Sequence, residues 1–246
     1  MTTQNYIYGL HPISALVNKE PKRIVQLYVQ VGRHDGRMQS VIDRAKETGI
    51  KTQAVSRDFL DKLSGYQVHQ GLVAEVEAAL ENSEADLWRL LDKLAEPVLL
   101  LILDGVQDPH NLGACLRAAN AAGVQAVIVP KDRAVALTPV VEKVASGAAA
   151  MTPLIQVTNL VRTLNELKQR GVWIYGASDD AQQSLFQANL SGGVAWVLGA
   201  EGAGLRRLTR ENCDVLLHIP MRGTVTSLNV AVAAGVCLFE TVRQKG

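Results

Sequence analysis

The feature that most constrains the fold is a regular alternation of apolar, strand-length runs with helical segments, which begins after Pro97. The first run, VLLLILDGV at residues 98–106, is apolar almost throughout, as in a strand that is covered on both faces. A helical pattern at residues 111–122 follows it and stops at Gly123. Strands that alternate with helices in this way are typical of a mostly parallel α/β sheet.

The same alternation continues along the rest of the chain. Further strands are predicted at residues 124–129, 154–157, 172–175, 194–198 and 216–220. Further helices are predicted at residues 138–149, from Thr158 or Asn159 to Gly171, and from Ser227 to Arg243. We therefore expect an α/β domain over residues 98–246.

The region before this domain has shorter elements and reads as one small α/β unit. Helical spacing at residues 11–19, 37–48 and 58–63 is interleaved with strand patterns at residues 24–30, 50–55 and 71–76. A polar, acidic stretch at residues 81–84 and the helical run DLWRLLDKL then separate the two regions. We predict a first domain at residues 1–76, a linker at 77–97 and a second domain at 98–246.

Composition narrows the class of protein. With 48% apolar and 20% charged residues, the chain of 246 residues is globular, and a prior of roughly 150 residues per domain allows one to two domains. The formal net charge of +1 lacks the strongly basic footprint of many nucleic-acid-binding proteins. This weakens an RNA or DNA hypothesis without excluding it, because a local basic patch can exist in a neutral chain.

Cysteine spacing and the N-terminal sequence indicate the compartment. The three cysteines lie far apart, so neither a disulfide framework nor a zinc motif is expected. The segment MTTQNYIYGLHPI lacks the features of a secretory signal, and the longest apolar run, residues 98–103, is far shorter than the roughly 20 residues of a membrane span. We expect a cytoplasmic protein without a membrane span or a bound metal.

Three loops that follow predicted strands hold most of the polar residues with chemical potential. They are DGVQDPHNLGACLR at residues 104–117, LGAEGAGLRR at 198–207 and IPMRGTVTSLN at 219–229. In open parallel sheets, ligands bind outside the carboxyl ends of the strands. The first and third loops also lead into helices, whose free amide groups can face a polar ligand.

The glycines of the second loop do not match a known phosphate-binding signature. Gly199, Gly202 and Gly204 are spaced G-x-x-G-x-G, the reverse of the dinucleotide fingerprint, and no G-x-x-x-x-G-K-[ST] sequence occurs in the chain. A dinucleotide-linked oxidoreductase and a P-loop hydrolase are therefore disfavoured. The spacing fits the close approach of a ligand and a tight turn of the loop equally well.

The first and third loops leave several interpretations open. His110 and Ser227 suggest a serine hydrolase, but Ser227 lacks the G-x-S-x-G elbow, and His110 fits a capping or packing role. Asp108 fits a turn and Ser227 an N-cap. Arg117 lies in a helix poor in charge, which indicates a specific partner, either a functional one or a neighbouring carboxylate.

Taken together, the loops resemble the three motifs of the SpoU (TrmH-like) family of RNA ribose 2′-O-methyltransferases in the SPOUT superfamily. The matching segments are DPHNLGACLRAANAAG, VLGAEGAGL and IPMRGTVTSLNVAVAAGVCLFE, and the likeness covers residues 98–243. The first domain, with YGLHPISAL and HQGLVAEV, resembles the substrate-binding domain of bacterial enzymes that methylate a guanosine in the peptidyl-transferase P loop of 23S ribosomal RNA. KDRAVAL and VTNLVRTL match as well, whereas Met151 and Thr152 stand where such sequences often carry a carboxylate.

The resemblance implies a fold, a cofactor and partners. The fold is a SPOUT α/β knot, a parallel sheet with a C-terminal trefoil knot, preceded by a small α/β substrate-binding domain like ribosomal protein L30e. The cofactor is S-adenosylmethionine, held by Leu198, Gly199, Ile219, Met221 and Leu228. The partners are 23S ribosomal RNA and a second copy of the chain, with no DNA and no membrane.

The resemblance also implies roles for polar residues. Arg117 matches the central catalytic arginine, and because a guanidinium stays protonated, we expect it to stabilise developing alkoxide charge and bind an RNA phosphate while a phosphate oxygen or water takes the proton. Asn111 orients the arginine or the ribose, and Glu201 holds Arg117 or the RNA. Ser227 and Asn229 complete the polar rim. Arg206 and Arg207 beside the second loop are expected to contact RNA.

Two alternatives share this fold. One is a ribose methyltransferase that acts on transfer RNA. The other is a noncatalytic RNA-binding or ribosome-assembly factor, which has no need for Asn111, Arg117, Glu201, Ser227 and Asn229 together.

Overall fold

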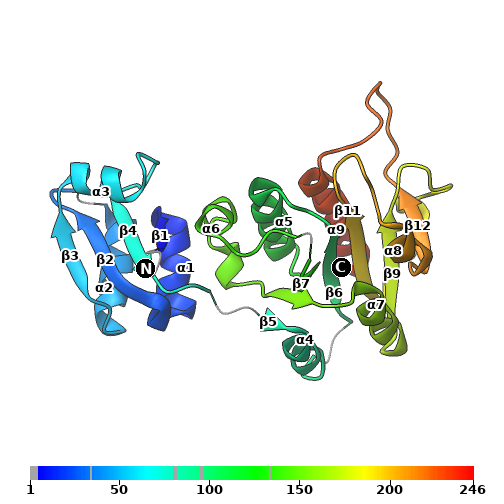
Figure 1. The fold of residues 1–246 in the computed structure, drawn as a ribbon, viewed down its shortest axis with the longest axis horizontal. Helices are drawn as coiled ribbons and strands as arrows, with labels where there is room; N and C mark the ends of the chain where they lie inside the picture. Colours follow the sequence, from blue (N-terminus) through cyan, green and yellow to red (C-terminus); the bar gives the residue numbers. More distant parts are fainter. Residues whose placement is uncertain (1–4, 34, 80–81, 95–96, 133) are drawn as a thin grey trace. The chain divides into compact units, whose positions relative to one another are not determined.

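The computed structural model describes residues 5–33, 35–79, 82–94, 97–132 and 134–246 (Figure 1). Residues 80, 81, 95 and 96 of the predicted linker and Arg133 of the KDRAVAL segment lie outside these ranges. The chain divides into two compact units, Met1–Leu80 with Leu137–Met151, and Glu81–Ala136 with Thr152–Gly246. Residues 137–151 thus belong with the first unit, although they are expected within the second domain on sequence pattern.

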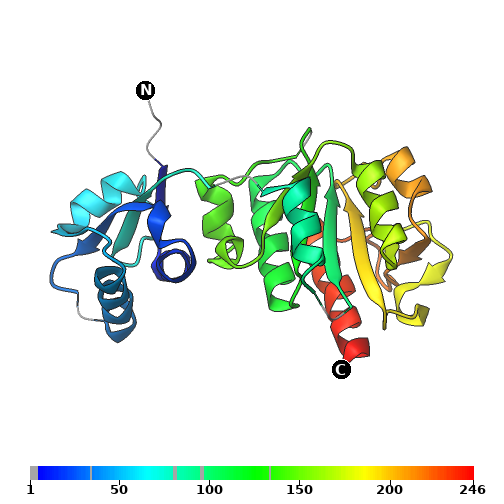
Figure 2. The same ribbon diagram turned by 90° about the horizontal axis from the view of Figure 1, so that it is seen from below.

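The first unit is built on a four-stranded sheet with the order β1-β4-β2-β3. Its strands are β1 (Asn5–Tyr8), β2 (Ile24–Gln30), β3 (Thr52–Val55) and β4 (Leu72–Val76), and β4 runs antiparallel to β1 and β2. Helices α1 (Leu10–Lys19) and α2 (Gly36–Glu47) lie on one face and α3 (Arg57–Leu63) on the other (Figure 2). A short 3-10 helix, η1 (Pro21–Arg23), precedes β2. Apolar side chains of α1, α2 and the sheet form the core.

A segment from the middle of the chain completes the first unit. It contains α6 (Pro139–Val144) and the 3-10 turn η2 (Ala148–Ala150). The predicted helix at residues 138–149 is wrong in length, because Ser146 and Gly147 take left-handed φ angles of 53° and 91° that end it. The buried Glu142 of α6 accepts a hydrogen bond from Arg23 at 3.0 Å, which fixes the segment to the rest of the unit.

The second unit confirms the predicted parallel sheet. It has eight strands in the order β10-β12-β9-β11-β6-β7-β8-β5, and every described pairing between them is parallel. The strands are β5 (Asn82–Ser83), β6 (Leu99–Asp104), β7 (Ala126–Pro130), β8 (Leu154–Val157), β9 (Val172–Ala177), β10 (Gln183–Ser184), β11 (Gly193–Gly199) and β12 (Val215–His218). All six residues of β6 are buried, as its continuous apolar sequence predicts.

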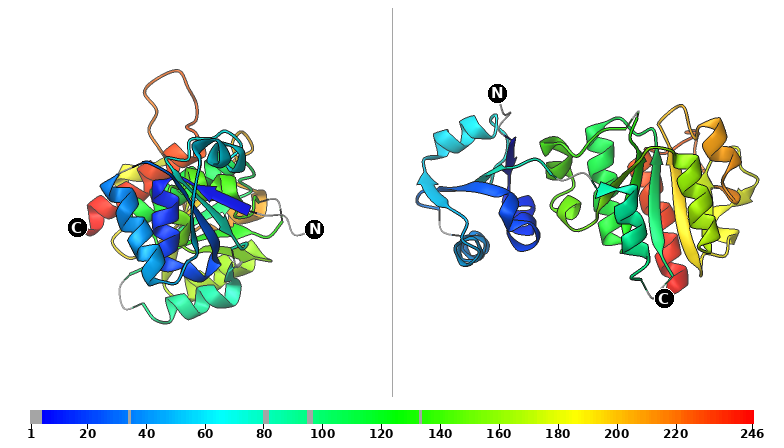
Figure 3. Two further views of the ribbon diagram at one scale, coloured as in Figure 1. Left: turned by 90° about the vertical axis from the view of Figure 1, so that its left-hand side faces the viewer. Right: turned by 60° about the horizontal axis from the view of Figure 1, so that its bottom comes forward.

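Helices cover both faces of this sheet (Figure 3). They are α4 (Glu84–Leu91), α5 (Pro109–Ala121), α7 (Leu160–Gln169), α8 (Arg207–Glu211) and α9 (Val230–Lys245), with a 3-10 turn η3 (Leu185–Gln187). Although α4 lies in the predicted linker, its Leu87 is buried in the core of the unit. None of the helices in the described ranges is long and apolar enough to span a membrane.

Local capping sets where the two site-bearing helices begin. Asp108 caps α5 by accepting from the amides of His110 and Asn111, and Pro109 occupies the first helical position. The predicted start of the last helix at Ser227 is wrong. Asn229 is the N-cap, because its side chain accepts from the Ala231 amide at 2.9 Å, and α9 begins at Val230.

Candidate active site

A pocket of about 420 Å³ lies at the carboxyl ends of β9, β11 and β12. The loops after β11 and β12, residues 199–205 and 219–229, both contribute to its lining. It is lined by all the residues that were predicted to hold a cofactor, namely Leu198, Gly199, Ile219, Met221 and Leu228. Glu201 and Ser227 line it as well. The pocket thus lies where ligands bind in open parallel sheets, and two segments that are far apart in the sequence line it.

The glycines of the second loop are explained by the loop itself. A Cβ atom on Gly199 would overlap the carbonyl group of Gly204, whose N–H donates to the Ala200 carbonyl at 2.9 Å. Gly202 and Gly204 have φ angles of 77° and 63°, which few residues with a side chain adopt. The tight turn thus accounts for all these glycines, and it forms one wall of the pocket.

A buried carboxylate anchors the end of this loop. Asp104, the last residue of β6, is only 1% exposed, and it accepts from the Arg206 amide at 3.0 Å and from Arg206 Nε at 2.5 Å. Arg206, which was predicted to contact RNA, pairs with Asp104, and its side chain is 42% exposed. Arg207 is exposed and pairs with Glu211 at 2.8 Å.

The structure adds polar residues that the sequence interpretation missed. Arg210 of α8 donates to both carboxylate oxygens of Asp180 at 2.9 and 3.0 Å and to Ser178 Oγ at 2.6 Å. Ser178 Oγ in turn donates to Asp180 at 2.6 Å, and these bonds hold the pKa of Asp180 below its usual range. All three residues line the pocket. Their signal was available, since the sequence SDD follows β9 at the same sheet edge.

The first and third loops meet in a direct contact. Asn229 Nδ2 donates to Asn111 Oδ1 at 2.8 Å, across 118 positions of sequence. Asn229 lies between Leu228 and Val230, both of which line the pocket. The amide pair therefore lies beside the pocket and joins the start of α5 to the start of α9.

Arg117 stands apart from the other predicted site residues. It is exposed on α5 and does not line the pocket. Within the described ranges no hydrogen bond or ion pair involves its side chain. The neighbouring carboxylate that would have made it a structural arginine is thus missing from the described part of the chain, and its charge is available to a ligand or to another chain.

The surroundings of Ser227 and of the three cysteines argue against a nucleophilic serine or cysteine at this site. Among the described hydrogen bonds none joins His110 to Ser227, so the serine-hydrolase interpretation has no base for its hydroxyl. Burial raises the pKa of Cys115, Cys213 and Cys237 to about 12, which makes them poor nucleophiles at neutral pH. The described residues include no group of three or more His, Cys, Asp or Glu side chains suited to a metal ion.

Family models match both units of the chain. The SpoU rRNA Methylase family model matches residues 98–239, which include the pocket and all three loops. The model for RNA 2′-O ribose methyltransferase substrate binding matches residues 6–81.

Individual relatives extend over nearly the whole chain. It is 56% identical over 239 residues to the 23S rRNA (guanosine-2′-O-)-methyltransferase RlmB of Coxiella burnetii, covering 97% of this chain and 95% of the relative. It is 55% identical over 240 residues to the RlmB of Pasteurella multocida, covering 97% and 98%. The SpoU methyltransferase AviRb from Streptomyces viridochromogenes, solved in complex with AdoMet, has the same fold with a TM-score of 0.80 at 24% identity, covering 98% of this chain and 90% of that one.

Proposed function

This chain belongs to the SpoU rRNA methylase family, and on that premise we propose that it transfers a methyl group from S-adenosylmethionine to the ribose 2′-hydroxyl of a guanosine in 23S ribosomal RNA. The relatives named for this reaction match nearly its full length. The observation that carries the proposal is the pocket in which the second and third family motifs meet. The proposed target guanosine is the one in the peptidyl-transferase P loop of 23S ribosomal RNA.

The pocket suits the proposed cofactor. Its volume of about 420 Å³ falls in the range of roughly 300–1,000 Å³ that is usual for small-ligand sites. Leu198, Ile219 and Leu228 offer apolar surface to an adenine ring, and Glu201 offers a carboxylate to cationic groups. When bound, S-adenosylmethionine supplies an electrophilic methyl group.

The residues of the chain then supply position and charge. A ribose hydroxyl is a weak nucleophile, so it must be held in line with the methyl group, and the Asn111–Asn229 pair is placed to hold it beside the pocket. Arg117 keeps its proton and stabilises the developing alkoxide while it binds an RNA phosphate. Ser227 and Glu201 complete the polar rim. A phosphate oxygen or water takes the proton.

We propose that two copies of the chain complete the site. Arg117 lies outside the pocket of its own chain and has no partner among the described residues, so a second copy can bring it to the reacting hydroxyl. The neighbouring helix α9 also exposes Val232, Phe239 and Val242, which a dimer interface would bury.

Because the chain belongs to this family, we also propose three finer features: a C-terminal knot, the type of the first unit and the cellular compartment. We propose that the C-terminal segment forms a trefoil knot, since the chain leaves β11, returns past β9 to form β12, and then crosses back as α9 beside α5 (Figure 1). We propose that the first unit is like ribosomal protein L30e and that the protein works in the cytoplasm. The free thiols of Cys115, Cys213 and Cys237 support a reducing compartment.

The experiment is to map 2′-O-methyl positions in ribosomal RNA from cells with and without this protein. We expect one guanosine of 23S ribosomal RNA to lose its methyl group. Transfer of labelled methyl groups to purified 23S or transfer RNA separates the main proposal from the alternative substrate. Methylation of transfer RNA alone would overturn the proposal.

A further inference from the structure

The three most exposed large apolar side chains of the first unit lie at one edge of its sheet. Tyr66 is 77% exposed, Val68 76% and Val31 64%, and no other large apolar side chain in the described ranges exceeds 61%. Tyr66 and Val68 belong to the loop of residues 64–71 between α3 and β4 (Figure 1), and Val31 follows β2. The Gln30 amide donates to the Gly71 carbonyl at 2.9 Å, which places the two segments side by side.

The backbone at Tyr66 is strained. Its φ angle is 60° and follows the 62° of Gly65, so a bulky aromatic residue occupies the left-handed region. Within the described ranges the Tyr66 side chain takes part in no hydrogen bond, so the strain is offset by backbone contacts of the loop and not by the ring. Strained positions of this kind cluster at ligand-binding sites, where the strain serves the ligand.

Hydrogen bonds hold the loop in this conformation. The buried His69 ring bridges Asp61 Oδ1 at 3.1 Å and the Gly71 amide at 3.0 Å. The Tyr66 amide donates to the Asp61 carbonyl at 2.6 Å, and Gln70 Oε1 accepts from the Leu10 amide at 2.9 Å. The apolar side chains are thus displayed on a preorganised loop, which lowers the entropic cost of binding.

One cation without a carboxylate partner contacts the loop, and another lies in a neighbouring groove. Lys143 Nζ donates to Gln67 Oε1 at 3.2 Å and lies 4.2 Å from the Tyr8 ring. A groove of about 430 Å³ between α1 and α2 is lined by Leu10, whose amide bonds Gln70 of the loop, and by Arg37, and none of its lining residues is acidic. No ion pair in the described part of the chain involves Lys143 or Arg37. Unpaired cations beside an exposed ring suit a polyanion with planar groups.

We propose that this edge binds an unpaired segment of the RNA substrate, with a nucleobase stacked on Tyr66 and phosphates on Arg37 and Lys143. We call it the stacking edge and define it as Val31, Tyr66, Val68, Arg37 and Lys143. The proposal rests on the proposed function, which supplies RNA as the substrate. It explains how a chain with a net charge of +1 binds RNA, since stacking and a few unpaired cations replace a broad basic surface.

The test is Tyr66→Gly in the full chain. Glycine removes the ring and also relieves the positive φ, so a purely structural role predicts no loss of any kind. We expect the affinity for a 23S ribosomal RNA transcript to fall about 5- to 150-fold, the range for one base–aromatic stack. We expect KM to rise while kcat is kept, and the thermal midpoint not to fall.

Matched variants isolate the ring and the charge. Tyr66→Phe keeps the ring and is expected to bind within about twofold of wild type, as is Val25→Ala, which truncates a 48% exposed valine of β2. Arg37→Ala is expected to reduce the slope of log affinity against log salt by about one.

The possible outcomes distinguish a failure of the proposed RNA-binding edge from a failure of the proposed methyl transfer. Wild-type affinity of Tyr66→Gly for the transcript would overturn it, and a defect seen only on preribosomal particles would assign the edge to a protein partner instead. Wild-type protein that binds the transcript but transfers no methyl group would refute the proposed reaction, while the binding comparison would still decide the role of Tyr66.

Discussion

In the second unit, loops at the sheet edge enclose Leu198, Ile219 and Leu228 around a pocket of about 420 Å³. In the first unit, the loop at the sheet edge holds Tyr66 and Val68 out into solvent. A small cofactor gains affinity from enclosure, because most of its surface must be buried. An unpaired RNA strand needs an open platform that admits a long chain. In the proposed function, the two edges serve two ligands through opposite exposure of their apolar side chains.

The largest effect is expected for Arg117→Ala, which tests whether methyl transfer depends on the second unit while RNA binding depends mainly on the first. We expect kcat to fall about 10²- to 10³-fold, as when one donor to a developing oxyanion is removed. The thermal midpoint is expected to stay close to wild type, because the Arg117 side chain has no partner among the described residues. RNA affinity is expected to fall only slightly, because Arg117 supplies a single phosphate contact. Labelled methyl transfer, RNA binding and thermal melting measure the three quantities.

Arg89→Ala is the control, since that arginine is 71% exposed, forms a surface pair with Asp86 and otherwise donates to the Ala85 carbonyl of its own helix. If Arg117→Ala raised KM and left kcat unchanged, Arg117 would contribute to RNA binding and not to methyl transfer, and the two edges would not differ in function as proposed.

Asp104→Ala tests whether the enclosing edge is rigidly anchored. The variant removes the buried partner of Arg206, and we expect the free energy of unfolding to fall by about 2 kcal/mol, less than for a fully buried pair because Arg206 is 42% exposed. Urea unfolding measures it. Asp92→Ala, which removes an exposed partner of Arg170, is expected to cost less than about 1 kcal/mol. Equal effects would show that the buried anchor contributes no more than a surface pair.

Gly199→Ala tests whether the enclosure depends on the tight turn. The added Cβ meets the backbone of Gly204, which cannot yield as a flexible side chain would, so the turn must open. We expect at least about tenfold weaker binding of S-adenosylmethionine by calorimetry, equivalent to roughly 1.4 kcal/mol. Gly223→Ala, on the neighbouring loop, has open space around it and should bind the cofactor normally. Normal binding by Gly199→Ala would mean that the turn does not shape the pocket.

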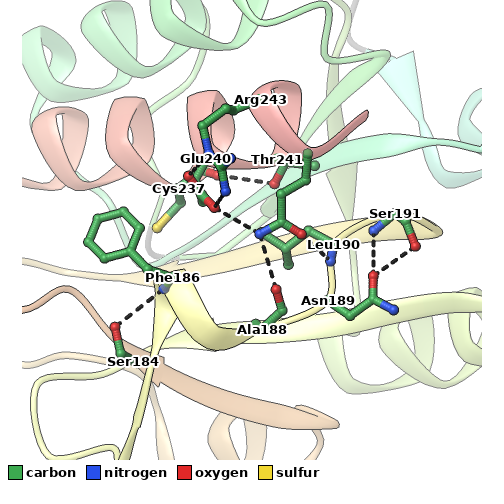
Figure 4. A network of polar contacts seen from close by, with 11 residues as sticks. Ser184, Phe186, Ala188, Asn189, Leu190, Ser191, Cys237, Glu240, Thr241 and Arg243 are labelled. Atoms are coloured by element: carbon green, nitrogen blue, oxygen red, sulfur yellow. Dashed lines mark hydrogen bonds and ion pairs between the residues drawn. The ribbon is translucent and has the colours of Figure 1, made fainter. Parts of the chain in front are cut away.

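Glu240→Gln gives the smallest expected effect, because it changes a structural contact away from both ligand sites. Figure 4 shows Glu240 beside Arg243 within a network of polar contacts. Glu240 accepts from Arg243 at 2.8 and 2.7 Å and from Gln244 at 2.8 Å, and these bonds lower its pKa to about 2 from its usual 4.5. A lowered folded-state pKa stabilises the fold above pH 4.5, and the effect is lost as the pH falls towards 2. Gln244 also donates to the Ala188 carbonyl at 3.1 Å, so these hydrogen bonds connect α9 to the segment that follows η3.

We expect Glu240→Gln to melt about 2–4 °C below wild type at pH 7, the shift for roughly 1 kcal/mol in a chain of this size. The difference should shrink between pH 4.5 and 2. A difference that stays constant over this range, measured by thermal melting, would show that the charge of Glu240 contributes nothing.

Much of the second unit followed from local pattern. The continuous apolar run of β6 predicted a strand buried on both faces, and the alternation with helices predicted the parallel sheet that is observed. Helix ends were less predictable, because Ser227 and Asn229 are both good N-caps and only the fold shows that Asn229 takes the role. The residues 137–151 look like part of the second region in sequence, but their contacts place them in the first unit.

By itself, the sequence determined most of the strands and helices of the second unit and pointed to the loops that line its site, because parallel strands align their carboxyl ends at one sheet edge. Only the tertiary structure decided the partner of each side chain. It paired Arg206 with the buried Asp104, left Arg117 without a partner among the described residues, and displayed Tyr66 on a strained loop. The physical reason is range: periodicity and capping act over a few neighbouring residues, whereas these contacts join positions brought together only when the whole domain packs.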